Sequence, residues 1–449
     1  MTRRHRSTRS AALLIALMTL VGAGGLRVTA QDASATPDAS AIPGASSAPG
    51  HVASAPPSLD IETIDRASPE PDLVVSNVDL DALVQGNTDF AFDLLRQTHG
   101  ANVALGPLSI SIALAMQLAG ADGATARQMA RVLHLDLPRE RRDAAFDRLR
   151  RELGDLARPG LESSIVSQLF GQSGYEFGDD FLDTISSHYA APLAVLDFAR
   201  DANAARQVIN GFVAAHTAGR IADLIPPGAV TGLTRLVLVN ATYLKADWER
   251  PFNAAFTEAR PFLLASGKRV RVPTMAMSAG EATARGPGYQ AIELPYVGGR
   301  LAMLIVVPDD LGRFERTLTA ARLATLVSRL REDGVDLTLP IFSSRTQVDL
   351  IPSLTALGMR DAFDPQRADL SGVSDEPGLH VSAAIHQAYI SVAEQGTEAA
   401  AATAIGDTGT SGPPPKLNVD RPFLWIIRDR VTGTILYLGH VTDPRITAH

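Results

Sequence analysis

The sequence predicts an α+β fold in which helices pack on a large mixed β-sheet. Apolar residues at helical spacing are found early in the chain, and runs rich in branched and aromatic residues dominate later. Two of those runs, 235–240 and 301–307, are apolar on both alternating faces, which is typical of central strands covered on both sides. Because the chain has no internal repeat period, we expect one such fold over residues 73–449.

The first helices are predicted from apolar spacing. Residues 87–98 place Phe90 and Leu94 four positions apart, so that both side chains lie on one face of a helix. Residues 108–118 are strongly apolar and follow Pro107, a residue favoured in the first turn of a helix. Both segments are therefore predicted to be buried helices.

A third helix is predicted over residues 136–154, where arginines alternate with acidic residues. Mixed charge of this kind is typical of a solvated helix face. A site for a polyanion is the alternative interpretation. The arginines concerned are Arg139, Arg141, Arg142, Arg148, Arg150 and Arg151.

Strands are predicted where branched and aromatic residues gather. The predicted strands cover residues 234–245, 289–295, 301–307, 335–339, 380–392 and 423–428.

Composition excludes several classes of protein. The 449 residues, 45% hydrophobic and 20% charged, suffice for one large domain or two ordinary ones. The net charge of −8 argues against a nucleic-acid binder, which would carry a concentrated basic surface. Without any cysteine the chain can form neither disulfides, a thiol nucleophile nor a cysteine-bound metal site. The folded part must therefore be stabilised by its core alone.

Residues 1–30 are predicted to be an export signal. A basic head that includes Arg3 and Arg4 precedes an apolar stretch over 11–21, and small residues suited to cleavage end at Ala30. The arginine pair invites a twin-arginine route, although the rest of that motif is missing. An uncleaved membrane anchor is the alternative, but the apolar stretch is shorter than the roughly 20 residues of a spanning helix. We therefore expect a secreted, extracellular protein with no membrane span after signal removal.

Residues 31–72 consist mainly of Ala, Ser, Pro and Asp. Few aromatic or branched apolar residues are present, so burial cannot offset the entropy lost on ordering. The segment is predicted to be a flexible linker.

No pattern for an enzyme's active site is found. The sequence has no G-x-S-x-G nucleophile turn, and its histidines show no H-E-x-x-H spacing for a metal. A glycine-rich phosphate loop is absent as well. We therefore expect no enzyme, no metal and no cofactor, while an enzyme without a recognised motif stays the alternative.

The segment that begins at Glu394 is the most informative part of the chain. Residues 399–405 are small and uncharged, a glycine-rich run follows from Gly406, and three prolines end it at Pro415. Nothing bulky prevents this segment from pairing as a strand, and nothing in it is apolar enough to demand burial. It can therefore be either a strand or a loop.

Distinctive sequence blocks are spread over residues 73–449. The most specific runs from Leu238 to Phe252, because it combines an internal Asn240 with a Trp-x-x-Pro-Phe end. Further blocks are 102–110, 120–125, 209–213, 272–275, 340–342, 357–359, 368–372, 421–423 and 438–441. In their sequence and their order, these blocks resemble the serpin family.

The resemblance implies a serpin fold, with a large mixed sheet, additional sheets, about eight to nine helices and an exposed reactive-centre loop. It also implies that the loop is bait for a serine or cysteine protease, is cleaved with formation of an acyl-enzyme, and then inserts into the sheet. Serpin loop insertion is itself a standard example of strand addition. The expected partner is a target serine protease, covalently trapped by a monomeric inhibitor.

The composition of the loop fits insertion. In an extended chain Thr397, Ala401 and Thr403 share one face, and small side chains there can slide over a packed sheet without overpacking it. Gly396 is expected to be the pivot, because glycine adopts positive φ readily. A plain helix is the alternative, since alanine favours helices. The resemblance implies a hinge made of Glu394, Gly396, Thr397, Glu398, Ala399, Ala400, Ala401, Ala402 and Thr403.

Hinge spacing in the family implies that the reactive bond joins Thr410 and Ser411. The bonds that follow Thr408 and Gly409 are the alternatives. A small β-branched Thr suits a protease with a small apolar primary pocket, such as an elastase-like or subtilisin-like enzyme, and does not suit a trypsin-like pocket.

The resemblance also implies a sheet-opening cluster that comprises Ser109, Asn240 and His386, with Trp248 near the point of first insertion. Ordinary satisfied core packing is the alternative for each residue. The sequence departs from the family at Gly106, a position that is commonly Ser, so one hydroxyl of the cluster is missing.

We therefore predict an irreversible suicide-substrate inhibitor of serine proteases. The alternative is a non-inhibitory serpin that acts as a binding or chaperone module. The small hinge residues 399–402 favour inhibition, because bulky or charged residues there would block insertion.

Overall fold

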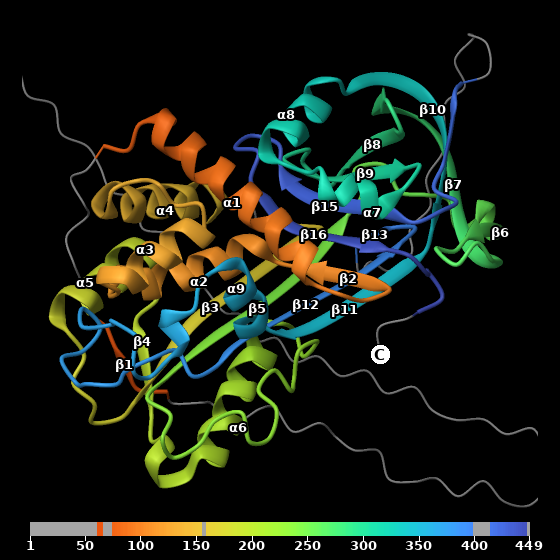
Figure 1. The fold of residues 1–449 in the computed structure, drawn as a ribbon. Coiled ribbons are helices and arrows are strands. Elements are labelled where there is room, and N and C mark those ends of the chain that lie inside the picture. Colours follow the sequence, from red (N-terminus) through yellow and green to blue (C-terminus); the bar gives the residue numbers. More distant parts are fainter. Residues whose placement is uncertain (1–60, 66–73, 155–158, 398–413, 447–449) are drawn as a thin grey trace, which may run out of the picture. The chain divides into compact units, whose positions relative to one another are not determined.

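The computed structural model describes residues 61–65, 74–154, 159–397 and 414–446. These residues form two β-sheets with helices packed on them (Figure 1). The predicted α+β class is therefore confirmed. Nine α-helices and two short 3-10 helices lie in the described part: α1 (Asn77–Gln97), α2 (Pro107–Ala119), α3 (Gly123–Val132), α4 (Arg139–Gly154), α5 (Asp179–Tyr189), α6 (Phe198–His216), α7 (Leu311–Arg316), α8 (Ala320–Ser328), α9 (Leu350–Leu357), η1 (Ala254–Phe256) and η2 (Asp361–Phe363).

Sheet A has seven strands in the order β1-β4-β3-β5-β13-β12-β11. Most neighbours are antiparallel, but β3 with β4 and β5 with β12 are parallel, so the sheet is mixed as predicted. Its strands are β1 (Thr63–Ile64), β3 (Leu161–Gln172), β4 (Leu193–Leu196), β5 (Leu236–Asp247), β11 (Phe342–Asp349), β12 (Ala384–Ala393) and β13 (Gly396–Thr397).

Sheet B has nine strands, eight of them in the order β14-β10-β7-β8-β9-β15-β16-β2, while β6 pairs with β7. Every residue of β9 is buried, which confirms the prediction of a central strand. The strands are β2 (Asn102–Leu105), β6 (Glu258–Leu263), β7 (Arg269–Gly286), β8 (Tyr289–Pro295), β9 (Leu301–Pro308), β10 (Arg331–Pro340), β14 (Lys416–Asn418), β15 (Phe423–Asp429) and β16 (Ile435–Val441).

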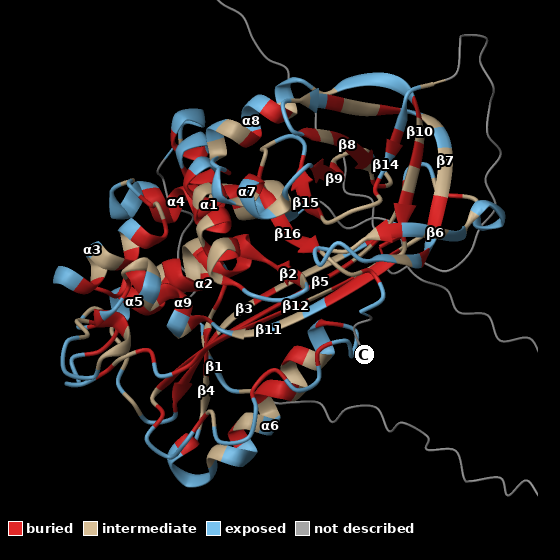
Figure 2. Ribbon diagram, turned by 45° about the vertical axis from the view of Figure 1, so that its right-hand side comes forward, coloured by how far each residue is buried: buried red, intermediate tan, exposed pale blue. Residues whose placement is uncertain are grey.

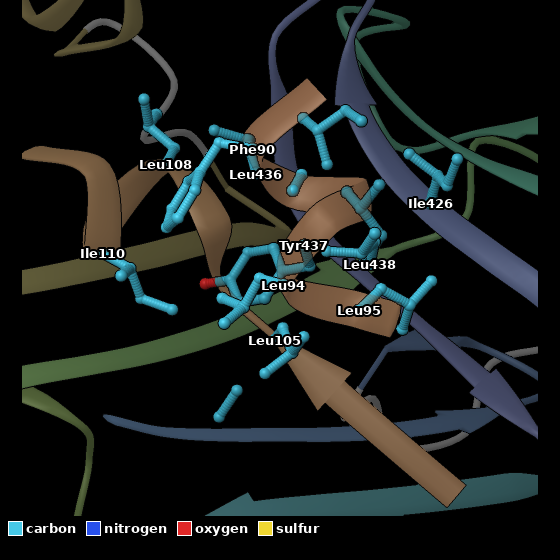
Figure 3. Close-up of a cluster of buried hydrophobic side chains, with 14 of the residues drawn as sticks. Phe90, Leu94, Leu95, Leu105, Leu108, Ile110, Ile426, Leu436, Tyr437 and Leu438 are labelled. Carbon is cyan, nitrogen blue, oxygen red and sulfur yellow. The ribbon is translucent and has the colours of Figure 1, made fainter. Parts of the chain in front are cut away.

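Helices cover sheet A on both faces (Figure 1). On one face α2 packs against β3 and β5, and α1 packs on α2; both helices also contact β16 of sheet B. Figure 3 shows Phe90 and Leu94 among the buried side chains of this core. On the other face α6 covers β3 and β5 through a second apolar cluster that includes Ile209 and Val239. Buried residues line the central strands, such as β5, β9 and β15, while exposed residues lie on the outer sides of the helices and on parts of β7 and β10 (Figure 2).

Two sequence predictions need correction. The first helix begins at Asn77, ten residues before the predicted start, because the Ser76 side chain caps it by accepting from the Asp79 N–H at 3.2 Å. The segment 31–72 is not linker throughout, since Thr63–Ile64 pairs with β4 at the edge of sheet A. Two apolar residues in a polar stretch gave too weak a pattern to predict this strand.

The sequence predicts a solvated face for the arginine-rich helix α4, but part of that face is buried in the structure. Arg142 is buried and donates from Nε to Asp143 Oδ1 at 2.9 Å, while the Tyr189 hydroxyl donates to the same oxygen at 2.7 Å. Arg150 and Arg151 both bind the buried Asp147. Pairing with acids of the same helix satisfies these charges and gives no support to a polyanion site.

Candidate functional site

Strands β5 and β12 run side by side and then separate. They pair in parallel from Leu238 with Ala384 to Tyr243 with Tyr389. Beyond that point β13 lies between them, with Thr397 opposite Val392 of β12 and Ala246 of β5. We call this arrangement the fork.

The structure places the start of the predicted hinge inside the fork. Glu394 lies in the turn after β12, and Gly396 and Thr397 form β13. The rest of the predicted hinge, residues 398–403, and the predicted reactive bond between Thr410 and Ser411 lie outside the described residues.

Thr397 is fully buried at the fork. Its Oγ1 lies 2.8 Å from the hydroxyl oxygen of Tyr296, which is buried as well. Burial raises the pKa of Tyr296 well above its usual value, so the phenol keeps its proton for this hydrogen bond. A long or charged side chain at position 397 would therefore be buried beside the neutral hydroxyl of Tyr296.

Gly396 has a positive φ of 153°, as expected of a pivot. A Cβ at this position would lie 2.1 Å from the carbonyl oxygen of Ala246 and 2.7 Å from the Cα of Asp247. The close approach of β13 to β5 therefore requires glycine.

Trp248 stacks on Tyr296 beside the fork, with ring centroids 4.6 Å apart and an interplanar angle of 9°. Its indole Nε1 donates to the carbonyl of Ala393 at 3.1 Å, and its backbone N–H donates to the carbonyl of Gln395 at 2.8 Å. Both bonds hold the turn between β12 and β13.

Glu394 is held by two further bonds. The Thr257 hydroxyl donates to its carboxylate at 2.7 Å, and the Phe252 N–H donates to its carbonyl at 2.8 Å. These two bonds attach the turn between β12 and β13 to residues 252–257, which follow β5.

Asn240 is the centre of a polar cluster on the line where β5 and β12 pair. Its Oδ1 accepts from His386 Nδ1 at 2.5 Å and lies 2.9 Å from the Ser109 hydroxyl, and its Nδ2 donates to Ser167 Oγ at 3.2 Å. Asn240 and His386 are direct partners across the β5–β12 pairing. The bond between Asn240 and His386 must break before another strand can pass between β5 and β12.

Neighbouring groups fix the tautomer of His386. The Gly106 N–H donates to Nε2 at 3.1 Å, so Nε2 is the acceptor and Nδ1 carries the proton. Burial lowers the pKa of His386 to about 3. If Nε2 were protonated, its N–H would point at the N–H of Gly106. His386 is therefore neutral while β5 and β12 are paired.

We predict that acid weakens the native state through His386. In the unfolded chain the ring binds a proton below its usual pKa of 6.5, whereas in the fold it stays neutral down to about 3. The contribution of His386 to the free energy of unfolding is therefore fully present above pH 6.5. It falls by about 1.4 kcal/mol per pH unit as the pH drops towards 3. Urea denaturation of the wild type and of His386→Gln measures the slope. Equal slopes in both proteins would contradict this prediction.

Gly106 fits this cluster because Thr242 fills the space beside it. A Cβ at position 106 would lie 2.7 Å from both Cγ2 and Oγ1 of Thr242. Thr242 therefore explains physically why this chain lacks the serine that the family commonly has.

We predict that Gly106→Ser destabilises the protein by about 1–3 kcal/mol through overpacking. Adding Thr242→Ala is expected to restore most of the loss, because it removes both clashing atoms. Urea denaturation of the two single variants and the double variant measures the coupling, and additive losses would show that Thr242 is not the obstacle.

The structure thus brings Ser109, Asn240 and His386 together, and it places Trp248 at the fork and not in the cluster. Sequence reasoning missed Tyr296, Ser167 and Thr257. Tyr296 directly follows the predicted strand 289–295, but no pattern marks it as a partner of Thr397.

Among the described residues no group of acidic or histidine side chains is arranged to hold a metal ion. Within those same ranges, no helix has the length and apolarity needed to cross a membrane.

Comparisons with known proteins agree with this geometry. Residues 85–444 match the family described as Serpin (serine protease inhibitor). Serpin B6 of Bos taurus is 38% identical over 389 residues, which cover 81% of this chain and all of the relative. The leukocyte elastase inhibitor of Xenopus tropicalis is 35% identical over 370 residues, which cover 80% of this chain and 98% of the relative.

The fold is similar to solved serpin structures as well. The crystal structure of maspin superposes with a TM-score of 0.76 at 25% identity, covering 82% of this chain and 100% of maspin. Serpins are protease inhibitors and not enzymes, and they typically bind target proteases. Because residues 85–444 match the family and relatives at 35–38% identity span most of the chain, the chain belongs to the serpin family.

Proposed function

We propose that this protein is an exported, irreversible suicide-substrate inhibitor of serine proteases. The single observation that carries the proposal is the fork, in which β13 lies antiparallel to both β5 and β12. A strand that continues β13 after cleavage of the loop would pair with both neighbours in the same way. The inserted strand would replace the parallel pairing in which residues 238–243 of β5 bond to residues 384–389 of β12.

Insertion has the energy needed to trap a protease. About a dozen new backbone hydrogen bonds at roughly 0.5–1.5 kcal/mol each amount to on the order of 10 kcal/mol. That is comparable with the stability of a whole domain, so the uncut protein is kinetically held in its loop-out state. Each roughly 1.4 kcal/mol that distorts the acyl-enzyme slows its deacylation tenfold.

We propose that the reactive bond follows Thr410 and that the target has a small apolar primary pocket. A β-branched threonine fits an elastase-like or subtilisin-like pocket better than the deep acidic pocket of a trypsin-like enzyme. The name of the amphibian relative, an elastase inhibitor, supports the same class of target. The basic and apolar stretches of residues 1–30 support export.

A panel of proteases tests the proposal. The protein is incubated with elastase-like, subtilisin-like, chymotrypsin-like and trypsin-like enzymes, and the products are separated on a denaturing gel. We expect a covalent complex with an elastase-like or subtilisin-like enzyme, and mass spectrometry of the released C-terminal peptide to begin at Ser411. Cleavage by every enzyme without any complex would favour the non-inhibitory alternative.

A further inference from the structure

A short strand from the N-terminal extension covers the outer edge of sheet A. Strand β4 pairs on one side with β3 and on the other with β1, where Thr63 lies opposite Ala194 and Ile64 opposite Leu193. The Val195 N–H also donates to the carbonyl of Glu62 at 2.9 Å. Without residues 61–65 these groups of β4 would form an open edge, which is a template for pairing with another chain.

The covering strand contributes to both cores of the protein. Ile64 packs against the main core. Ile61 packs against the second cluster, which holds Phe198 and Ile209 of α6. Glu62, Thr63 and Asp65 are exposed. Residues 61–65 therefore bind the sheet edge by alternating apolar anchors as well as by backbone bonds.

The second cluster also connects this edge with the fork. It includes Val239 of β5 and Ile385 of β12, which lie on opposite sides of the line where the sheet must open. The other sheet residues of this cluster, such as Phe170 and Ala194, lie on β3, β4 and β5, so opening between β5 and β12 separates Ile385 from them. An edge strand that packs on the same cluster adds to the packing that opposes this separation.

We propose that the outer edge of β4 is a docking surface for an extended strand with apolar residues three positions apart, and that residues 61–65 occupy it within the same chain. Occupancy has two effects. It holds sheet A closed in the loop-out state, and it prevents a second copy of the chain from adding a strand at the same edge. The first effect rests on the proposed loop insertion, and the second does not.

Substitutions in the full-length protein test the proposal. Ile61→Asp together with Ile64→Asp removes both anchors, while Glu62→Gln together with Asp65→Asn changes two exposed residues of the same segment and is the control. Each protein is warmed below its unfolding midpoint, and the loss of the monomeric form and the gain of a heat-resistant form are followed over time. No protease is used, so the result does not depend on whether a protease is trapped.

We expect the Ile61 and Ile64 double variant to lose the monomeric loop-out form about tenfold faster than the control, which corresponds to roughly 1.4 kcal/mol. A synthetic peptide of residues 59–66, added in excess, is expected to restore the slow rate, whereas a scrambled peptide is not. Equal rates for the double variant and the control, or no rescue by the peptide, would overturn the proposal.

Discussion

Thr397→Arg is expected to convert the protein from an inhibitor into a substrate. The side chain of Thr397 is fully buried between β5 and β12 and bonded to Tyr296, so an arginine there would be a buried charge without a partner. An arginine would leave the fork in the uncut protein, and insertion would then have to bury its charge at a cost of several kcal/mol, which slows insertion about a hundredfold or more. Deacylation then overtakes insertion, and the protease is released.

The measurement is the ratio of covalent complex to cleaved protein on a denaturing gel. Thr397→Ser is the matched control, because it keeps the hydroxyl that faces Tyr296 and is expected to keep the complex. Thr397→Val separates the hydrogen bond from the volume of the side chain and is expected to give an intermediate ratio. An unchanged yield of complex for Thr397→Arg would contradict the assignment of the hinge.

Asn240→Leu is expected to release sheet A from its closed state. The substitution keeps the branched shape of the side chain but leaves the buried His386 Nδ1 without its acceptor, whereas the Ser167 hydroxyl keeps its bond to the Ser109 carbonyl. An unsatisfied buried group costs about 1–3 kcal/mol, and opening of the sheet no longer has to break the bond between Asn240 and His386. We therefore expect conversion to the loop-inserted form to accelerate on the order of a hundredfold.

Asn87→Leu is the control for this variant. Asn87 is buried on α1 and its Oδ1 accepts from the Ser111 hydroxyl at 2.6 Å, away from the β5–β12 line. Its loss is expected to lower the urea midpoint without a comparable rise in the rate of conversion. A similar rate for both variants would show that the Asn240 cluster has no special part in opening.

Much of the fold could be predicted because its central strands carry a strong pattern. Residues 289–295 form the strand β8 with the predicted bounds, and 301–307 lie within β9. Strand β7 was not predicted, because it mixes arginine, serine and glycine and faces solvent along much of its length. The edge strand β1 was missed because its pairing with β4 depends on residues far apart in the sequence.

The candidate site, too, could be predicted only in part. Ser109, Asn240 and His386 were predicted from a family resemblance, which supplies long-range proximity that local patterns lack. Tyr296 and Thr257 could not be found in this way, since each acts through a single side-chain bond to the hinge. The space that excludes a side chain at Gly106 is likewise a property of tertiary packing and not of sequence pattern.

The central claim is that the cut loop enters sheet A between β5 and β12. Thermal unfolding before and after complete cleavage of the loop, with the protease removed, tests it most directly. A dozen new backbone bonds worth on the order of 10 kcal/mol predict a rise in Tm on the order of 10 °C or more. A cleaved protein that unfolds at the same temperature as the intact one would contradict the claim.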